Sequence, residues 1–133
     1  MYKSNNATTV DLKLDLEEVL ININQALPVG LLLNEILNNA FKHAFVGRGE
    51  GEIQIKLSET DDKVQLVVKD NGVGFSSEEE SSSSLGHTLI DTFIKQLRAT
   101  VDFNTDNGTH YTIEFEKQNL KGTMASNMNL GYD

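Results

Sequence analysis

The sequence contains no cysteine, no tryptophan and a single proline. Without cysteine, the chain can form neither a disulfide framework nor a thiolate metal site. No apolar run approaches the roughly 18 residues of a membrane span, and no charged and then apolar signal segment opens the chain. These absences exclude a disulfide-stabilised secreted fold and direct membrane insertion, and they favour a cytoplasmic protein.

Positive charge is also scarce, because 11 Lys and Arg residues face 20 Asp and Glu residues and leave a net charge of −9. Nonspecific binding to nucleic acid or to anionic lipid depends on clustered Lys and Arg, so neither is expected. A nucleotide remains compatible, since backbone amides, one lysine and a metal ion can hold its phosphates. With 133 residues, 38% of them hydrophobic, the chain is long enough for one compact domain with a core.

Hydrophobic periodicity predicts the secondary structure. The expected elements, in order, are a strand at 10–14, a short strand at 20–23, a helix from Pro28 to about Phe45, a hairpin over 53–68, a helix over 89–97 and a hairpin over 101–115. This order predicts an α+β fold: a two-layer α/β sandwich in which helices cover one face of a mixed, mostly antiparallel sheet.

The domain prediction has three parts. Residues 1–9 are polar and form an arm, residues 10–116 form the domain, and residues 117–133 form a polar tail. Within the domain, the serine- and glutamate-rich segment 76–84 cannot bury anything and is expected to be a mobile loop.

The first helix carries two faces. Apolar residues recur with helical spacing at 33, 36, 37, 40, 41 and 44, which predicts a core-facing stripe. Glu35, Asn38, Asn39 and Lys42 follow the same spacing on another face. Asparagine is a poor helix former, so two in succession favour a ligand-binding face. The alternative is a solvated face with ordinary Glu–Lys pairing.

Asp70 is the single residue that most clearly indicates a binding site. It continues the inward parity of Val64, Leu66 and Val68, and a buried carboxylate needs a partner, for which an adenine amino group would serve. The alternative is a strand-end aspartate that turns out to solvent and starts a turn. Gly72 and Gly74 follow, and these glycines would allow positive φ and a close approach of a base or sugar.

Three further residues suit a nucleotide. Asn39 offers Mg²⁺ a neutral oxygen ligand, and Lys42 can balance phosphate charge. Gly86 precedes the second helix and could let its N-terminus face phosphate oxygens, although a helix-entry glycine is the plainer interpretation. The common phosphate-binding and dinucleotide-binding glycine motifs are absent from the sequence.

Four motifs together resemble the ATP-binding catalytic domain of two-component sensor histidine kinases, in the ATPase superfamily shared with gyrase, the ninety-kilodalton heat-shock chaperone and mismatch-repair proteins. They are an asparagine box, NEILNNAFKHAF at 34–45; a first glycine box, DNGVGF at 70–75; a second glycine box, SLGHTLI at 84–90; and the closing NGT at 107–109. The residues of these motifs are similar to those of the subfamily whose dimerisation helices differ from the commonest kinase type.

The resemblance implies a Bergerat-type fold, with ATP between the first long helix and a lid, and it implies roles for individual residues. Glu35 and Lys42 would be catalytic, and Asn39 would hold Mg²⁺. Glu35 stands where related ATPases place a general base for water, and in a kinase it would instead help to position the phosphoryl acceptor. The implied ATP-binding residues are Asn38, Asn39, Lys42, His43, Asp70, Gly72, Gly74, Leu85, Gly86, His87, Thr88 and Thr109.

The function implied is transfer of the ATP γ-phosphoryl group to a histidine on a separate dimerisation domain, with a response regulator downstream. Two alternatives are a serine kinase of the anti-sigma-factor type and a non-catalytic module that binds a nucleotide or a protein partner. Ser84 and His87 depart from the second glycine box, where glycine and an aliphatic residue are usual. No dimerisation helix with an acceptor histidine precedes the domain, so a fragment of a longer kinase is expected.

Overall fold

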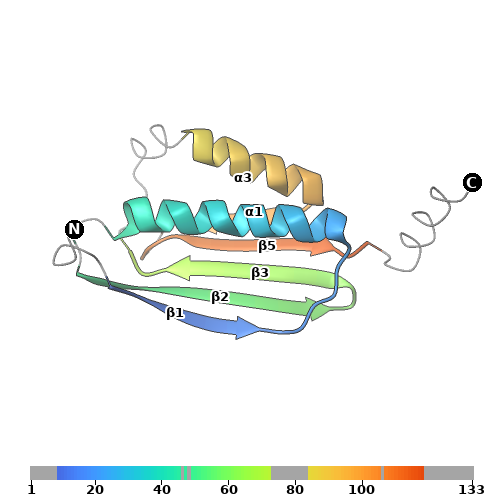
Figure 1. Cartoon of the computed structure of the whole chain (residues 1–133), viewed down its shortest axis with the longest axis horizontal. Helices are drawn as coiled ribbons and strands as arrows, with labels where there is room; N and C mark the ends of the chain where they lie inside the picture. Colours follow the sequence, from blue (N-terminus) through green and yellow to red (C-terminus); the bar gives the residue numbers. More distant parts are fainter. Residues whose placement is uncertain (1–8, 46, 48, 73–83, 106, 119–133) are drawn as a thin grey trace, which may run out of the picture.

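The computed structural model describes residues 9–45, 47, 49–72, 84–105 and 107–118, without the side chains of 84–87. A five-stranded sheet has the order β1-β2-β3-β5-β4. The two helices lie on one side of it, as Figure 1 shows. The strands and helices are β1 (Thr9–Leu16), α1 (Ile23–Asn39), a π-helical turn η2 (Ala40–Ala44), β2 (Glu50–Thr60), β3 (Lys63–Asp70), α3 (Ser84–Leu97), β4 (Thr100–Asn104) and β5 (His110–Glu116). The two-layer α+β prediction is confirmed.

Both predicted hairpins are present. Strands β2 and β3 pair antiparallel, and their turn consists of Asp61 and Asp62, which both have positive φ. Positive φ at both central residues is the geometry of a tight hairpin turn that follows the twist of the strands. Strands β4 and β5 pair antiparallel as well, and Asn107 and Gly108 in their turn have φ of 57° and 105°. Only β1 is parallel to its neighbour β2, so the sheet is mixed.

The start of α1 differs from the prediction. The Asn22 side chain accepts a hydrogen bond from the Asn24 backbone N–H at 2.8 Å, so the helix begins at Ile23. The strand expected at 20–23 is therefore wrong. Pro28 lies inside the helix and is buried, rather than in its first turn. The apolar run at 20–23 is ambiguous in sequence, and the asparagine cap decides between strand and helix.

The core lies between the helices and the sheet. Its fully buried members include Leu32 from α1 and Ile53, Val64 and Ile113 from the sheet. The predicted apolar stripe of α1 is buried at residues 36, 40 and 44, but Phe41 is 54% exposed. The turn from Ala40 to Ala44 is π-helical, and the wider turn rotates later residues away from the positions that a regular α-helix would give them.

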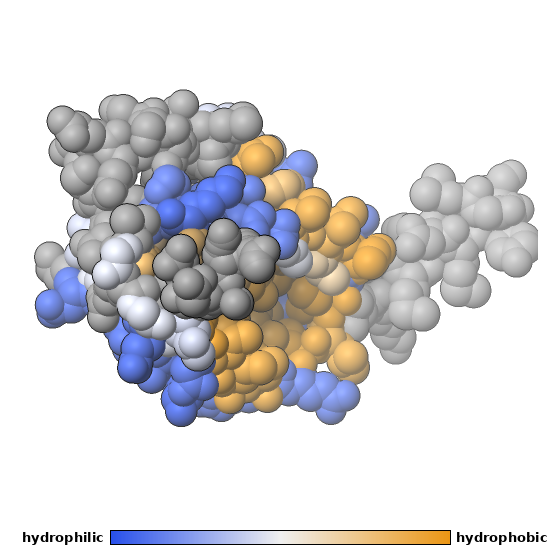
Figure 2. All heavy atoms as spheres, turned by 60° about the vertical axis from the view of Figure 1, so that its left-hand side comes forward, coloured by the Kyte–Doolittle hydropathy of each residue, from blue (hydrophilic) through white to orange (hydrophobic). Residues whose placement is uncertain are grey.

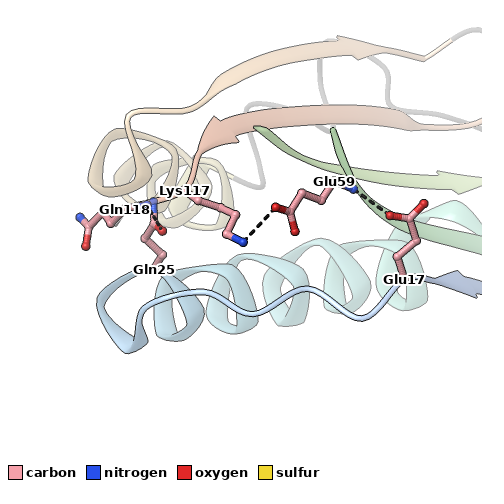
Figure 3. A network of polar contacts seen from close by, with 5 residues as sticks. All are labelled: Glu17, Gln25, Glu59, Lys117 and Gln118. Carbon is pink, nitrogen blue, oxygen red and sulfur yellow. Dashed lines mark hydrogen bonds and ion pairs between the residues drawn. The ribbon is translucent and has the colours of Figure 1, made fainter. Parts of the chain in front are cut away.

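Polar contacts at the other end of α1 fix the helix to the sheet, as Figure 3 shows. The Gln25 side chain donates to the Glu116 carbonyl at 2.8 Å and accepts from the Gln118 N–H at 2.9 Å. Beside them, Lys117 Nζ lies 2.9 Å from Glu59 Oε2, and the Glu59 N–H donates to Glu17 Oε1 at 3.0 Å. Two side-chain contacts thus join the start of α1 to the end of β5.

No helix in the described part of the chain combines the length and the hydropathy that crossing a bilayer requires. The predicted arm and tail fall almost wholly on residues 1–8 and 119–133, which lie outside the described residues. Thr9, assigned to the arm, is the first residue of β1.

Candidate functional site

A pocket lies where the C-terminal end of β3 meets the end of α1. Its cavity has a volume of only about 10 Å³, which is room for about one water molecule. A larger group, such as a planar ring, would enter only after the walls had moved apart. Its walls are formed by Ile36, Asn39, Ala40, Ile53, Val68, Asp70, Thr109 and Tyr111. The pocket therefore joins three residues from separate predicted motifs: Asn39, Asp70 and Thr109.

The Asp70 carboxylate is held in place by backbone groups. Its Oδ1 accepts hydrogen bonds from the Gly72 N–H at 2.9 Å and from the Thr109 N–H at 3.1 Å. The Asp70 N–H donates to the Thr109 carbonyl at 2.9 Å, which completes the link between β3 and the turn before β5. No described residue donates to the second oxygen, Oδ2. Asp70 therefore starts the following turn, as expected of a strand-end aspartate, and it also lines the pocket.

Two glycines allow this close packing. A Cβ on Gly72 would overlap the Ala44 carbonyl, and a Cβ on Gly108 would overlap the Asp70 carbonyl. Gly108 also has φ of 105°, whereas Gly72 is not among the positive-φ residues. Gly72 therefore does not use the positive φ that a glycine allows, and its lack of a Cβ instead makes room for the Ala44 carbonyl at the end of η2. Gly74 lies outside the described residues.

Asn39 is the last residue of α1 and is only 5% exposed. Its Nδ2 finds no hydrogen-bond partner among the described residues. A buried, unsatisfied amide costs about 1–3 kcal/mol, so its presence in a pocket wall points to a ligand as the missing partner. Rotation of the amide exchanges its nitrogen and oxygen, so Asn39 can also present an oxygen to a hard cation such as Mg²⁺.

The other predicted helix residues lie at the same end of the helix but are not among the residues that line the pocket. Glu35 is half-buried one turn before Asn39, and Asn38 is exposed. Lys42 is exposed and His43 half-buried, and both lie in the π-helical turn. Turns of this kind are frequent at functional sites. The structure thus brings these four residues to the end of α1 that carries the pocket.

The second glycine box forms the first turns of α3, which begins at Ser84. Gly86 therefore lies within the helix, whereas the sequence predicted that it would precede the helix. The side chains of Leu85 and His87 lie outside the described residues, and Thr88 is exposed. The predicted loop at 76–84 also falls almost entirely outside the described residues.

Sequence reasoning missed the apolar walls and one strand link. The walls come from Ile36, Ala40, Ile53, Val68 and Tyr111, whose periodicity marked them only as core residues. Asn71 Oδ1 accepts from the Glu52 N–H at 2.9 Å, and the Asn71 N–H donates to the Glu52 carbonyl at 3.2 Å. This pair fastens the end of β3 to β2 directly beside Asp70.

Once the walls have moved apart, their chemistry suits a flat heterocycle with an amino group. The apolar walls would contact its faces, Asp70 would accept a hydrogen bond from its amino group, and Asn39 would lie on its outer side. The described residues contain no group of three or more His, Cys, Asp or Glu side chains that could hold a metal ion. A Mg²⁺ ion bound together with a nucleotide would find one oxygen ligand at Asn39.

A family model described as histidine kinase-, DNA gyrase B- and HSP90-like ATPase matches residues 24–119. The chain belongs to this family. The domain is an ATP-binding domain similar to the catalytic domains of histidine kinases.

Three relatives illustrate the range of similarity. Blue-light-activated histidine kinase 2 of Erythrobacter litoralis is 29% identical over 77 residues, which is 56% of this chain and 22% of that protein. Serine-protein kinase RsbW of Listeria monocytogenes is 38% identical over 48 residues, or 36% of this chain and 31% of that protein. The histidine kinase domain of Erythrobacter litoralis EL346 superposes with a TM-score of 0.76 at 24% identity, covering 88% of this chain and 56% of that structure.

The chain spans about a fifth to a third of these curated relatives and about half of the solved structure. Because the sequence identity to the solved structure is only 24%, the structural likeness shows the fold alone. One of the two curated relatives is a histidine kinase, and the other is a serine-protein kinase.

Proposed function

We propose that this chain is the catalytic domain of a sensor histidine kinase, which transfers the γ-phosphoryl group of ATP to a histidine on a separate dimerisation domain. The observation that carries the proposal is the pocket shared by Asp70 and the buried, unpartnered amide of Asn39. A response regulator would receive the phosphoryl group in turn, and the reaction would take place in the cytoplasm.

The adenine ring enters the pocket with its amino group toward Asp70. Oδ1 is occupied by the amides of Gly72 and Thr109, so Oδ2 is the atom that accepts from the base. The backbone link to Thr109 keeps the carboxylate from rotating away. Recognition of the base then depends on one fixed acceptor and on apolar walls, an arrangement typical of small-ligand pockets.

The phosphates extend toward the end of α1, past Asn39 to Lys42 and the first turn of α3. Lys42 balances phosphate charge, and free amides at the start of α3 would attract the terminal oxygens. Mg²⁺, held by Asn39, would neutralise charge on the phosphates. Glu35 positions the accepting imidazole. In phosphoryl transfer, such positioning and charge stabilisation account for most of the catalysis.

Two measurements test the proposal. ATP at 100 times its dissociation constant is expected to stabilise the fold by about 2.7 kcal/mol in thermal unfolding, with a larger shift when Mg²⁺ is present. With a supplied dimerisation domain of the variant type, labelled ATP is expected to give an acid-labile, base-stable phosphohistidine. If millimolar ATP produces no thermal shift, the partner-binding alternative gains. If ATP binds but no supplied domain is labelled, the nucleotide-binding alternative gains.

The serine kinase alternative is favoured by one observation, the 38% identity to serine-protein kinase RsbW over 48 residues. Both kinds of kinase require the same adenine pocket, so ATP binding does not separate them. The chemistry of the product does, because phosphoserine survives acid that hydrolyses phosphohistidine. Acid-stable label on a serine of a partner protein, with none on a histidine domain, would favour the serine kinase.

A further inference from the structure

Strand β1 ends the sheet, and its outer edge has no neighbouring strand in the described part of the chain. The Thr9 N–H donates to the Gly49 carbonyl and the Glu17 N–H to the Leu57 carbonyl, so the odd-numbered residues direct their backbone groups toward β2. Backbone direction alternates along a strand. The N–H and C=O groups of Val10, Leu12, Leu14 and Leu16 therefore point to the free edge, ready for another strand.

The same strand exposes apolar side chains. Leu12, Leu14 and Leu16 are 49%, 58% and 55% exposed. They lie beside Ile53, Ile55 and Leu57 of β2, so they share the helix-covered face of the sheet. The segment after β1 and helix α1, which follow it in the chain, expose four more apolar side chains: Leu20, Ile23, Leu27 and Leu31. Figure 2 shows a large area of hydrophobic residues on the side that its view presents. A concentration of this kind marks an interaction surface.

The opposite face of β1 carries charges of alternating sign. Asp11, Lys13 and Asp15 follow one another at two-residue spacing, and Lys13 Nζ lies 3.2 Å from Asp11 Oδ2. Both side chains of this pair are about 60% exposed. Charges on an edge strand discourage indiscriminate pairing. The alternation of negative and positive charges does, however, permit pairing with an antiparallel strand that places a charge of opposite sign across from each charged residue.

We propose that this partner is a second copy of the chain, whose β1 adds antiparallel to β1 with Leu12 opposite Leu12 of the second copy. In this register Val10 lies opposite Leu14 of the second copy, and these residues form the hydrogen-bonded pairs that their outward backbone groups require. Asp11 lies opposite Lys13 of the second copy, in the closer, non-hydrogen-bonded type of pair. The two-fold axis generates each pair twice.

Charge selects this register over its neighbours. Centring the pairing on Lys13 would place Lys13 opposite itself and Asp11 opposite Asp15 of the second copy. Centring it on Leu14 would pair Lys13 with Asp15 but would oppose Asp11 and Glu17. A shift by one residue would place leucines opposite charges on the wrong face. Only the Leu12 register combines apolar pairs on one face with opposite charges on the other.

The two-fold axis stands perpendicular to the joined sheet, so both helix layers lie on the same side. The exposed leucines of the two β1 strands would then contact each other on the helix-covered face of the joined sheet. Strand β1 contributes no residue to the Asp70 pocket, so dimer formation leaves that pocket open. The proposed contact is thus independent of the proposed activity.

A charge-swap experiment on the full 133-residue chain tests the contact. D11K places lysines at both 11 and 13, and K13D places aspartates at both, so each variant opposes like charges in its own dimer. Because opposite-charge cross-strand pairs are favourable and like pairs unfavourable, the dimer dissociation constant should rise at least about tenfold in each variant. An equimolar mixture restores both Lys–Asp pairs and should dimerise like the wild type. Sedimentation equilibrium measures all four samples.

The matched control is D102K, which makes the same charge change on β4, the other edge strand of the sheet. It should leave the dissociation constant unchanged. Tighter association of D11K would support the Leu14 register and overturn the one proposed. A wild type that stays monomeric at several hundred micromolar, or variants that dimerise like the wild type on their own, would overturn the second copy as the partner.

Discussion

The two carboxylate oxygens of Asp70 have separate tasks. Oδ1 accepts from two backbone amides and so shapes the turn, while Oδ2 has no donor among the described residues and remains for a ligand in the pocket that Asp70 lines. A substitution that preserves the first task and alters the second can therefore separate folding from binding. Few positions in a small domain allow this, because most pocket residues here also pack in the core.

Asp70→Asn is the substitution that separates them. The amide oxygen can still accept from Gly72 and Thr109, but the NH₂ group then meets the amino group of adenine, donor against donor. We expect ATP affinity to fall roughly 10- to 100-fold, the effect of an unpaired buried polar group. The melting temperature without ATP should stay within about 2 °C of the wild type. Calorimetric titration and thermal unfolding measure the two effects, and an unchanged titration curve would contradict the assignment.

Asn39→Ala is expected to uncouple ATP binding from Mg²⁺. Wild-type affinity should rise when Mg²⁺ is added, and the variant should show no such rise, because the helix no longer offers an oxygen ligand. Removing an unsatisfied buried amide should also raise the free energy of unfolding of the ligand-free variant by about 1 kcal/mol. Asn34→Ala, at an exposed position of the same helix, is the control and should bind ATP like the wild type with and without Mg²⁺. A variant that keeps the Mg²⁺ effect would refute this role.

At the scale of elements, the sequence predicted the repeating parts well. Alternation located both hairpins and β1, because half-buried strands must alternate, and the helical stripe located α1 and α3. It misplaced the start of α1, where a short apolar run suits strand and helix equally, and only the Asn22 cap decides. Phe41 was assigned to the core because periodicity assumes a regular helix, which the π-helical turn interrupts.

The site was predictable to the extent that its residues are unusual. Adjacent asparagines in a helix and an inward-facing aspartate conflict with local preferences, and such conflicts identified Asn39 and Asp70. The apolar walls carry no such conflict, since a pocket isoleucine and a core isoleucine follow the same pattern. The packing of Gly72 against Ala44 was also beyond prediction, because it joins two segments that only the fold brings together.

The contact between α1 and β5 gives a prediction for this scale. Gln25 is 4% exposed and satisfies two backbone groups, the Glu116 carbonyl and the Gln118 N–H. Gln25→Ala should lower the free energy of unfolding by about 2–3 kcal/mol, because both groups lose their partner. ATP affinity should not change, since Asn39 lies about 20 Å further along the helix. Denaturant titration measures the loss, with the exposed Asn24→Ala as control; equal stability of the two variants would contradict the role of this contact.

For the whole molecule, the net charge of −9 opposes the ligand proposed for it. Lys42 and the helix amides act locally, whereas the repulsion between the acidic surface and the phosphates extends over the Debye length, about 30 Å at 10 mM salt and 10 Å at 100 mM. Added salt should therefore screen repulsion more than it screens local attraction. We expect the dissociation constant of ATP at fixed Mg²⁺ to fall about threefold between 10 and 200 mM KCl.

Adenosine is the matched ligand for this measurement, because it occupies the same pocket and carries no phosphate. Its affinity should stay constant across the same salt range, which would assign the change to charge and exclude a general effect of salt on the fold. An ATP affinity that weakens with salt would mean that attraction near Lys42 and α3 outweighs the net charge. In that case Lys42→Gln should abolish the weakening, and the local cations, rather than the acidic surface, would govern how tightly the domain holds its nucleotide.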